Sequence, residues 1–227
     1  MTAFKSVLVD IDSLAAAHPA LECGAELARL AGARLKIVDV LIGREGSGAE
    51  FARARRAERL EAIARSVLGG SAEFELLTGQ PSMALVREVV RFNPDILVRA
   101  HARDVVAPRG RRSVDLQLCR LCPCPFWAVG PTATTAPKRI LAAVRATDDA
   151  SALDRRTIET ASHLARLHGA TLVVLHAWTA FGESVLRGRS TAEELTAYVN
   201  AAEATARDGL NALLNSFDEH PMACASY

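Results

Sequence analysis

An arginine-rich loop is the first feature of this sequence whose residue types could do chemistry. The stretch VRAHARDVVAPRGRRSVDLQL begins at Val98, leaves a run of apolar residues and enters a helical pattern at Ser113. In a parallel α/β protein such a loop often holds a phosphate, because backbone N–H groups and a helix N-terminus converge there. Loops of that kind are usually rich in glycine, whereas this one has only Gly110. Its arginines are Arg99, Arg103, Arg109, Arg111 and Arg112.

Two interpretations of this loop stay open. Arginine makes bidentate, charge-assisted bonds to phosphate, so the arginines could replace backbone amides as anion ligands, with Ser113 adding a helix N-terminus. Alternatively, the arginines are solvated or face an interface, and their side chains block the cleft that they border. Because arginines in a loop are usually just exposed, we favour a lost phosphate site.

Three cysteines in the segment CRLCPC form a second candidate: Cys119, Cys122 and Cys124. A structural zinc site needs four ligands, and the nearest further candidate, His101, would have to fold back from the loop. Free cysteine is among the most buried residue types, so we expect inert packing and no metal site. Reversible oxidation of a Cys119–Cys122 pair is the alternative.

The remaining ionisable residues do not form a recognisable catalytic group. The histidines are scattered, and no acid–base pair, G-x-S-x-G elbow or Walker-type loop is present. His176 would end a buried strand, at the sheet edge where ligands bind in such folds, although most such residues simply satisfy a hydrogen bond. We therefore predict that the protein is not an enzyme.

Composition narrows the class of protein. The 227 residues carry a net charge of +1, half of them are hydrophobic, and the five cysteines are odd in number, unlike a secreted disulfide framework. No apolar run approaches a membrane span and the N-terminus does not resemble a signal peptide, so we expect a soluble, cytoplasmic protein with no membrane role. Nucleic-acid binding through the arginines ranks last, because interleaved aromatics and a basic overall charge are missing.

Strand and helix signals alternate along residues 1–131. Short runs rich in apolar and β-branched residues predict buried strands, and amphipathic stretches between them predict helices. This alternation indicates βα units with right-handed crossovers, and hence a doubly wound, five-stranded parallel sheet of the Rossmann-like class. The predicted strands are 6–11, 34–41, 72–79, 95–100 and 126–130, and the predicted helices are 19–30, 49–68, 81–92 and one that begins at Ser113.

The pattern then restarts after a linker. Residues 132–137 are rich in Pro and Thr, and the later segment LARLHGATLVVL repeats the earlier LARLAGARLKIV. In this repeat Arg145 stands at the position of Asp12. We expect residues 138–227 to form an incomplete second domain of the order β-α-β-α, with no further strand after Ser216. A frameshift before the tail SFDEHPMACASY is an alternative explanation for the short second domain.

Four segments together resemble the universal stress protein family, in its tandem form with two such domains in one chain. They are the opening VLVDID, the G-x-P at Gly79-Gln80-Pro81, the NPDILV before the arginine loop, and the CPCPFWAVG that ends the first domain. The resemblance implies the sheet order 3-2-1-4-5. It also implies a truncated second domain, since the later strands of that order have no counterpart after Ser216.

The resemblance also implies a nucleotide site that is only partly present. ATP-binding members carry the signature G-x2-G-x9-G-[ST] after the fourth strand. Its glycine positions fall here on Arg99, Ala102 and Arg112, and none of them is glycine. Its last position is Ser113, and the acid near the adenine is matched by Asp12. The full candidate set is Ile11, Asp12, Val40, Arg99, Ala102, Arg112 and Ser113.

The expected function follows from this mixed site. The leading hypothesis is a non-catalytic, stress-responsive binding or regulatory protein with a degenerate nucleotide site and no cofactor. The alternative is a switch that binds ATP, AMP or another adenine nucleotide, or a weak ATPase, using Asp12, the arginine loop and Ser113. We also expect a homodimer, formed through the apolar edge strand Phe126–Val129 or by mutual completion of the second domains, and protein partners not yet identified.

Overall fold

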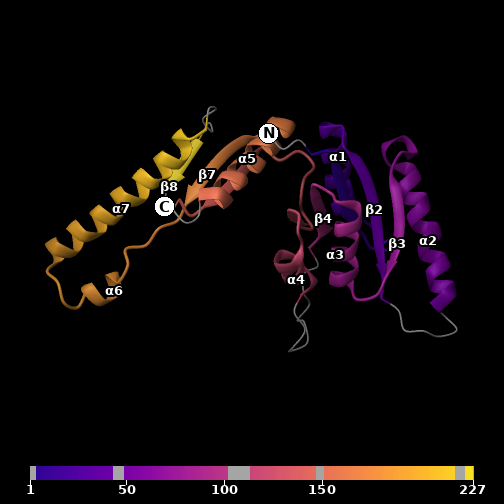
Figure 1. Cartoon of the computed structure of the whole chain (residues 1–227), viewed down its shortest axis with the longest axis horizontal. Helices are drawn as coiled ribbons and strands as arrows, with labels where there is room; N and C mark the ends of the chain where they lie inside the picture. Colours follow the sequence, from indigo (N-terminus) through magenta and orange to yellow (C-terminus); the bar gives the residue numbers. More distant parts are fainter. Residues whose placement is uncertain (1–3, 43–48, 102–112, 147–150, 218–222, 227) are drawn as a thin grey trace. The chain divides into compact units, whose positions relative to one another are not determined.

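The computed structural model divides the chain into two compact units, Ala3–Thr135 and Ala136–Tyr227 (Figure 1). It describes residues 4–42, 49–101, 113–146, 151–217 and 223–226. The division falls within the segment expected to be a linker.

The first unit is a doubly wound α/β domain. Its five strands are all parallel and follow the order β3-β2-β1-β4-β5, which confirms the predicted sheet. Its elements are β1 (Ser6–Asp10), α1 (Pro19–Ala31), β2 (Arg34–Leu41), α2 (Ala49–Ser66), the 3-10 helix η1 (Leu68–Gly70), β3 (Glu73–Thr78), α3 (Pro81–Phe92), β4 (Ile96–Ala100), α4 (Val114–Leu121) and β5 (Phe126–Val129).

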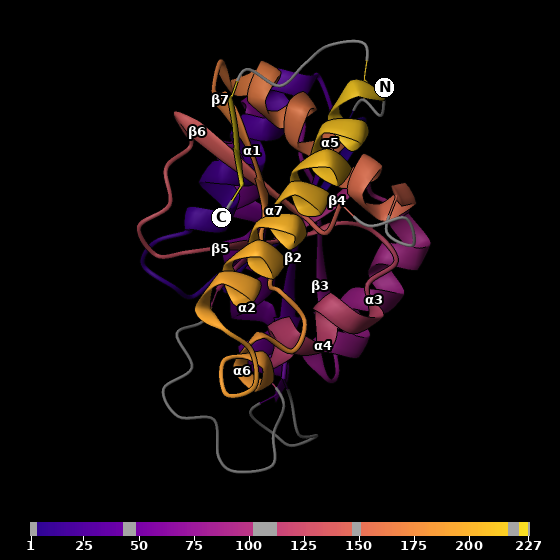
Figure 2. The ribbon, with the colours of Figure 1, turned by 90° about the vertical axis from the view of Figure 1, so that its left-hand side faces the viewer.

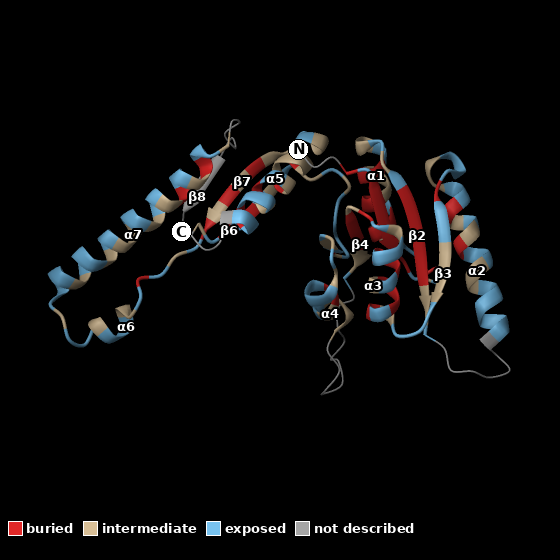
Figure 3. Cartoon of the chain, in the orientation of Figure 1, coloured by how far each residue is buried: buried red, intermediate tan, exposed pale blue. Residues whose placement is uncertain are grey.

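The central strand β1 is buried along its whole length because helices cover both faces of the sheet (Figure 3). On one face, α1 approaches so closely that a Cβ on Gly24 would come within 2.5 Å of Val9 Cγ2. On the other face, Leu8 packs with Leu85 of α3 and Leu118 of α4. Alternate residues of one strand therefore enter two separate cores, as a strand buried on both sides requires.

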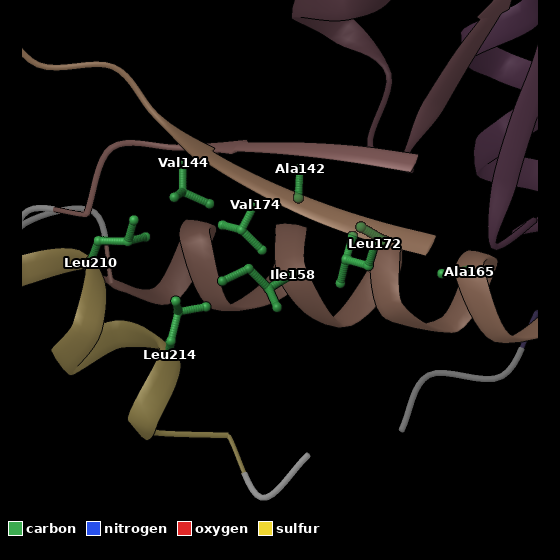
Figure 4. Close-up of a cluster of buried hydrophobic side chains, with 9 residues drawn as sticks. Ala142, Val144, Ile158, Ala165, Leu172, Val174, Leu210 and Leu214 are labelled. Carbon is green, nitrogen blue, oxygen red and sulfur yellow. The ribbon is translucent and has the colours of Figure 1, made fainter. Parts of the chain in front are cut away.

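The second unit is built around a smaller parallel sheet of order β6-β7-β8. Its elements are β6 (Arg139–Val144), α5 (Ser151–His168), β7 (Thr171–His176), α6 (Glu183–Leu186), α7 (Ala192–Asn215) and β8 (Ala223–Ser226). Figure 2 shows α7 along most of its length, with α6 beyond its N-terminal end. The α5 and α7 helices pack on the same sheet face, where Ile158, Leu210 and Leu214 contact Ala142, Val144, Leu172 and Val174 (Figure 4).

The strand β8 corrects the expectation that the second unit has the order β-α-β-α only. Ala223–Ser226 pairs in parallel with Val173–His176, so a third strand does follow Ser216. Its sequence, ACAS, has no β-branched or aromatic residue, and its strand conformation comes from pairing along β7 rather than from local propensity. The local sequence of residues 223–226 therefore gives no signal for the strand that their pairing with β7 produces.

Within the described residues, no helix is long and apolar enough to cross a membrane.

Candidate functional site

The first unit has a pocket at the carboxyl ends of its central strands, the edge where open α/β sheets bind ligands. We call this cavity of about 410 Å³ the first-unit pocket. The walls of the pocket are formed by the ends of β1, β2 and β4 and the residues that follow β1 and β4. Arg56 of α2 and Pro81 of α3 lie at its rim. The lining residues are Asp10, Ile11, Asp12, Asp39, Val40, Leu41, Ile42, Arg56, Pro81, Arg99, Ala100 and His101.

The pocket brings together four of the predicted site residues: Ile11, Asp12, Val40 and Arg99. Ser113 is not among its lining residues; its Oγ instead accepts a hydrogen bond from Leu116 N at 3.2 Å and caps α4. Ala102 and Arg112 lie outside the described residues. The three residues predicted for the base side thus line one pocket, and of those predicted for the phosphate side Arg99 also lines it, while Ser113 caps α4.

Arg56, which the sequence analysis did not single out, closes the base side with ion pairs. Its Nη1 lies 2.9 Å from Asp12 Oδ1 and 2.7 Å from Asp39 Oδ2. Asp39 is buried and also accepts hydrogen bonds from Ser13, at 3.1 Å from the backbone N and 2.5 Å from Oγ. The carboxylate that the resemblance assigns to the adenine therefore already has a guanidinium partner within its own chain.

Arg99 is held in the same way on the other side. Its Nη1 pairs with the carboxylate of Asp10, and its Nε donates to Asp115 Oδ1 at 3.2 Å. The second oxygen of Asp115 lies 2.7 Å from His101 Nδ1. Because β1 and β4 are neighbours with Asp10 opposite Arg99 in register, the pairing of the two strands places these side chains together. The side chain that stands at a glycine position of the family signature is thus anchored by two acids.

Asp10 is unusual because it is a buried carboxyl group at the carboxyl end of the central strand. Burial raises the pKa of Asp10 from its ordinary value of 3.8 to about 6, and the adjacent Arg99 guanidinium partly opposes this rise. The negative charges of Asp39 and Asp115 raise the pKa further. At neutral pH, Asp10 is therefore ionised and paired with Arg99.

Among the described residues, the pocket and its supports carry more negative than positive charge. Asp10, Asp12, Asp39 and Asp115 surround the guanidinium groups of Arg56 and Arg99. Both guanidinium groups are bonded to carboxylates, so neither presents an unneutralised positive charge to an anion. A phosphate at this surface would also face the nearby carboxylates, whose negative charges repel it.

Of the three cysteines of the CRLCPC segment, Cys122 and Cys124 pack against the core as expected, and Cys119 does not. Cys119 is exposed, while Cys122 and Cys124 are half-buried. The close pair is Cys122 and Cys124, whose Sγ atoms lie 3.5 Å apart. The sequence missed this pair because Cys119 and Cys122 are one helical turn apart, a spacing that usually brings side chains together, but the helix ends at Leu121. In the part of the chain that the structure describes, no cluster of His, Cys, Asp or Glu is arranged to hold a metal ion.

The second unit has a separate cavity of about 870 Å³ near the end of β7. Arg145, which stands where the first unit has Asp12, lies in its wall. His176 also lines this cavity; it is buried, with Nδ1 3.3 Å from the carbonyl oxygen of Val144. Tyr198 donates a hydrogen bond of 2.8 Å to the carbonyl of Phe181 across it. The aspartates of the first-unit pocket therefore have no acidic counterpart among the residues that line this cavity.

Comparison with known proteins identifies the fold. No protein-family model matches the sequence, and no curated protein matches it. A crystal structure of a putative universal stress protein from Pseudomonas aeruginosa UCBPP-PA14 matches over 99% of this chain and 74% of that chain, with a TM-score of 0.65 and 20% identity. The chain has the universal stress protein fold.

A second solved structure agrees with this result. A functionally unknown protein from Pseudomonas aeruginosa PAO1 matches over the same shares of the two chains, with a TM-score of 0.66 and 20% identity. A universal stress protein in complex with cAMP covers 58% of this chain, but with a TM-score of 0.45 that likeness carries no argument about a ligand. The universal stress protein fold is thus supported along nearly the whole chain, while its ligand must be argued from the site.

Proposed function

We propose that this chain is a tandem universal stress protein that acts by binding and regulation rather than by catalysis, and that its first-unit pocket is closed to nucleotide phosphates. The observation that carries this proposal is the anchoring of Arg99 by Asp10 and Asp115 at the position of a signature glycine. The repeated strand–helix order of the two units supports the tandem arrangement.

The physical reason is steric and electrostatic. A glycine at the end of β4 would let the backbone approach a triphosphate, whereas Arg99 adds a long side chain that is held across the pocket wall. Carboxylates at hydrogen-bond distance from both pocket arginines neutralise their attraction for an anion. Binding ATP would then require breaking ion pairs that are partly buried, and this cost reduces the affinity.

A second candidate function is an adenine-nucleotide switch or weak ATPase. The observation that favours it is the shared pocket itself, because Ile11, Asp12 and Val40 meet at the carboxyl ends of the strands. A ligand in this site would have to displace Arg56 from Asp12.

Thermal unfolding in the presence of ATP, ADP or AMP, with magnesium, tests both candidates. A ligand present at a hundred times its dissociation constant stabilises the folded state by about 2.7 kcal/mol and raises the midpoint visibly. We expect no shift at millimolar nucleotide. A rise in the wild type that disappears in Asp12→Ala and persists in the surface variant Glu26→Ala would overturn the closed-pocket proposal and favour the switch.

We also propose that the chain associates with a second copy of itself. The sheet face of the second unit opposite α5 and α7 leaves Leu141 60% exposed, although this residue repeats the fully buried Leu8. The edge of β6 that faces away from β7 has no described strand partner. Unpaired strand edges next to exposed apolar side chains favour association, and a matching copy offers both features.

A further inference from the structure

The turn between α4 and β5 brings two thiols together. Cys122 ends α4 with an extended backbone (φ −72°, ψ 124°), as expected for a residue that precedes a proline. The chain then bends at Pro123 and Cys124, and the Sγ atoms of Cys122 and Cys124 lie 3.5 Å apart. A sequence of two cysteines alternating with two prolines therefore produces a paired dithiol.

This dithiol lies away from the first-unit pocket. The carbonyl of Pro125 accepts a hydrogen bond from Leu97 N, which places the turn at the amino-terminal ends of β4 and β5, whereas the pocket lies at the carboxyl ends of the strands. Cys122 and Cys124 are both half-buried and pack at the edge of the core that contains Leu118. They are thus held in place by packing and still reachable by a small oxidant.

We propose that Cys122 and Cys124 form a reversible disulfide when the protein meets hydrogen peroxide. The Cys122 thiolate attacks the peroxide, the O–O bond breaks, and Cys122 becomes a sulfenic acid with release of water. The sulfur of Cys124 then attacks the Cys122 sulfur and displaces hydroxide, which leaves as water with the proton of Cys124. In total, two thiols lose two electrons and two protons, and one peroxide is reduced to two waters.

The hydrogen bond between the thiols assigns the order of attack. Either sulfur can donate in this hydrogen bond; with Cys124 as the donor, it lowers the pKa of Cys122 to about 7, against the effect of burial. The same hydrogen bond, burial and the adjacent negative charge raise the pKa of Cys124. Oxidation of Cys122 to a neutral sulfenic acid removes that charge, so Cys124 gives up its proton more readily in the second step.

In the second step, the two sulfur atoms need to move only a short distance. A disulfide has an S–S distance of about 2.05 Å, so the two sulfurs must approach by about 1.5 Å from their present separation. Rotation of the two thiol side chains can supply this movement at a turn that is bounded by α4 and β5.

Peptide mapping after peroxide treatment tests the proposal directly. Trypsin cleaves after Arg112, Arg120 and Lys138, so it separates Cys119 from the other two cysteines. We expect peptide 121–138 to lose two hydrogens and to resist iodoacetamide, with full reversal by dithiothreitol. Peptide 113–120 should be alkylated on Cys119 throughout.

The same map contains the outcomes that would overturn the proposal. A disulfide joining peptides 113–120 and 121–138 would assign the bond to Cys119. Free, alkylated Cys122 and Cys124, at a peroxide dose that oxidises an unperturbed peptide thiol in the same tube, would remove the redox role. The wild-type chain alone decides between these results, so the test does not depend on the folding of a variant.

Two variants separate the attacking thiol from its partner. In Cys124→Ala we expect dimedone to trap a sulfenic acid on Cys122, and we expect alkylation of Cys122 at pH 7 to slow roughly fifteenfold, as its pKa returns toward the unperturbed value of about 8.5. Cys119→Ala is the matched control and should behave as wild type. An unchanged alkylation rate in Cys124→Ala would contradict the assigned order of attack.

Discussion

Leu8 and Leu141 occupy the same position in the repeated opening strands of the two units and have opposite environments. Leu8 is fully buried, whereas Leu141 is 60% exposed. The difference comes from the helices on that face of the sheet: α3 and α4 cover Leu8, and α5 and α7 lie on the other face of the second sheet. The comparison teaches that the strand pattern alone fixes which side chains share a face, while later elements decide whether that face is buried.

A different contrast, in bonding partners and not in burial, is found at the end of the second strand of each unit. Asp39 and His176 are matched positions of the repeat and both are buried. Asp39 is an acid that needs Arg56 and Ser13, while His176 needs only a hydrogen-bonding partner such as the carbonyl of Val144. In the first unit, charged side chains at the strand ends therefore form a network of ion pairs. In the second unit, the pocket is instead lined by the aromatic side chains of Trp178, Phe181 and Tyr198.

The largest expected effect is on the matched leucines. Leu8→Ala removes a fully buried side chain and should lower the free energy of unfolding by about 2–5 kcal/mol. Leu141→Ala, made at an exposed position, should change the stability of the monomer by about 0.5 kcal/mol or less. Chemical denaturation of the two variants at low protein concentration measures both values.

The proposed self-association gives the comparison of Leu8 with Leu141 a second readout. Leu141→Asp should shift a dimer toward monomer in sedimentation or light scattering, because it places a charge on the apolar face proposed to meet a second copy. Asn200→Asp, which adds the same charge at an exposed position of α7 on the other side of this sheet, is the matched control. A wild type that stays monomeric at high concentration would refute self-association through this face.

An effect of intermediate size is expected from Asp10, which makes the free energy of unfolding depend on pH. The matched position of the second unit is Ala143, which cannot titrate. Because the folded pKa of Asp10, about 6, exceeds the ordinary 3.8, the folded state binds this proton more tightly. The resulting stability is fully present below about pH 4 and is lost as the pH rises through about 6.

Comparison of wild type with Asp10→Asn across this range measures the contribution. At 1.36 kcal/mol per pKa unit, the difference between the two proteins should change by up to about 3 kcal/mol between pH 4 and pH 7, with the wild type losing stability relative to the variant. A difference that stays constant with pH would show that Arg99 fully offsets the burial of Asp10.

Much of the first unit follows from the sequence, because each of its strands is a short apolar run flanked by residues that begin or end a helix. Pro19 and Pro81 open α1 and α3, and Gly32 closes α1 with a left-handed backbone. The candidate pocket residues Ile11, Asp12 and Val40 could also be predicted, since the carboxyl ends of parallel strands meet at one edge.

The parts that escaped prediction depend on long-range pairing. Arg56 reaches Asp12 and Asp39 from another element, and no local pattern on α2 distinguishes it from the other arginines of that helix. Residues 223–226 form a strand only because β7 offers a free edge. The Cys122–Cys124 contact depends on where α4 ends, and helix ends are the least certain feature of a sequence pattern.

The smallest expected effects concern the helix caps, and they separate a structural role of Ser113 from a phosphate-binding one. Ser113 Oγ accepts from Leu116 N, and Thr191 Oγ1 accepts from Glu194 N in the second unit, so the two residues do the same work at α4 and α7. Thr191 also belongs to a capping box, in which the Glu194 carboxylate accepts from Thr191 N at 2.9 Å. Ser113→Ala and Thr191→Ala should each cost about 1 kcal/mol of stability.

The effect of ATP on the stability of these two cap variants distinguishes the two roles of Ser113. If Ser113 only caps α4, both variants should show equally small losses of stability and the same indifference to ATP as the wild type. If Ser113 instead binds phosphate, ATP should stabilise the wild type and Thr191→Ala but not Ser113→Ala. Thr191→Ala is the matched control here, because it removes the same kind of hydrogen bond from a helix outside the first unit. The difference between the two variants therefore reports on the site and not on the loss of a cap.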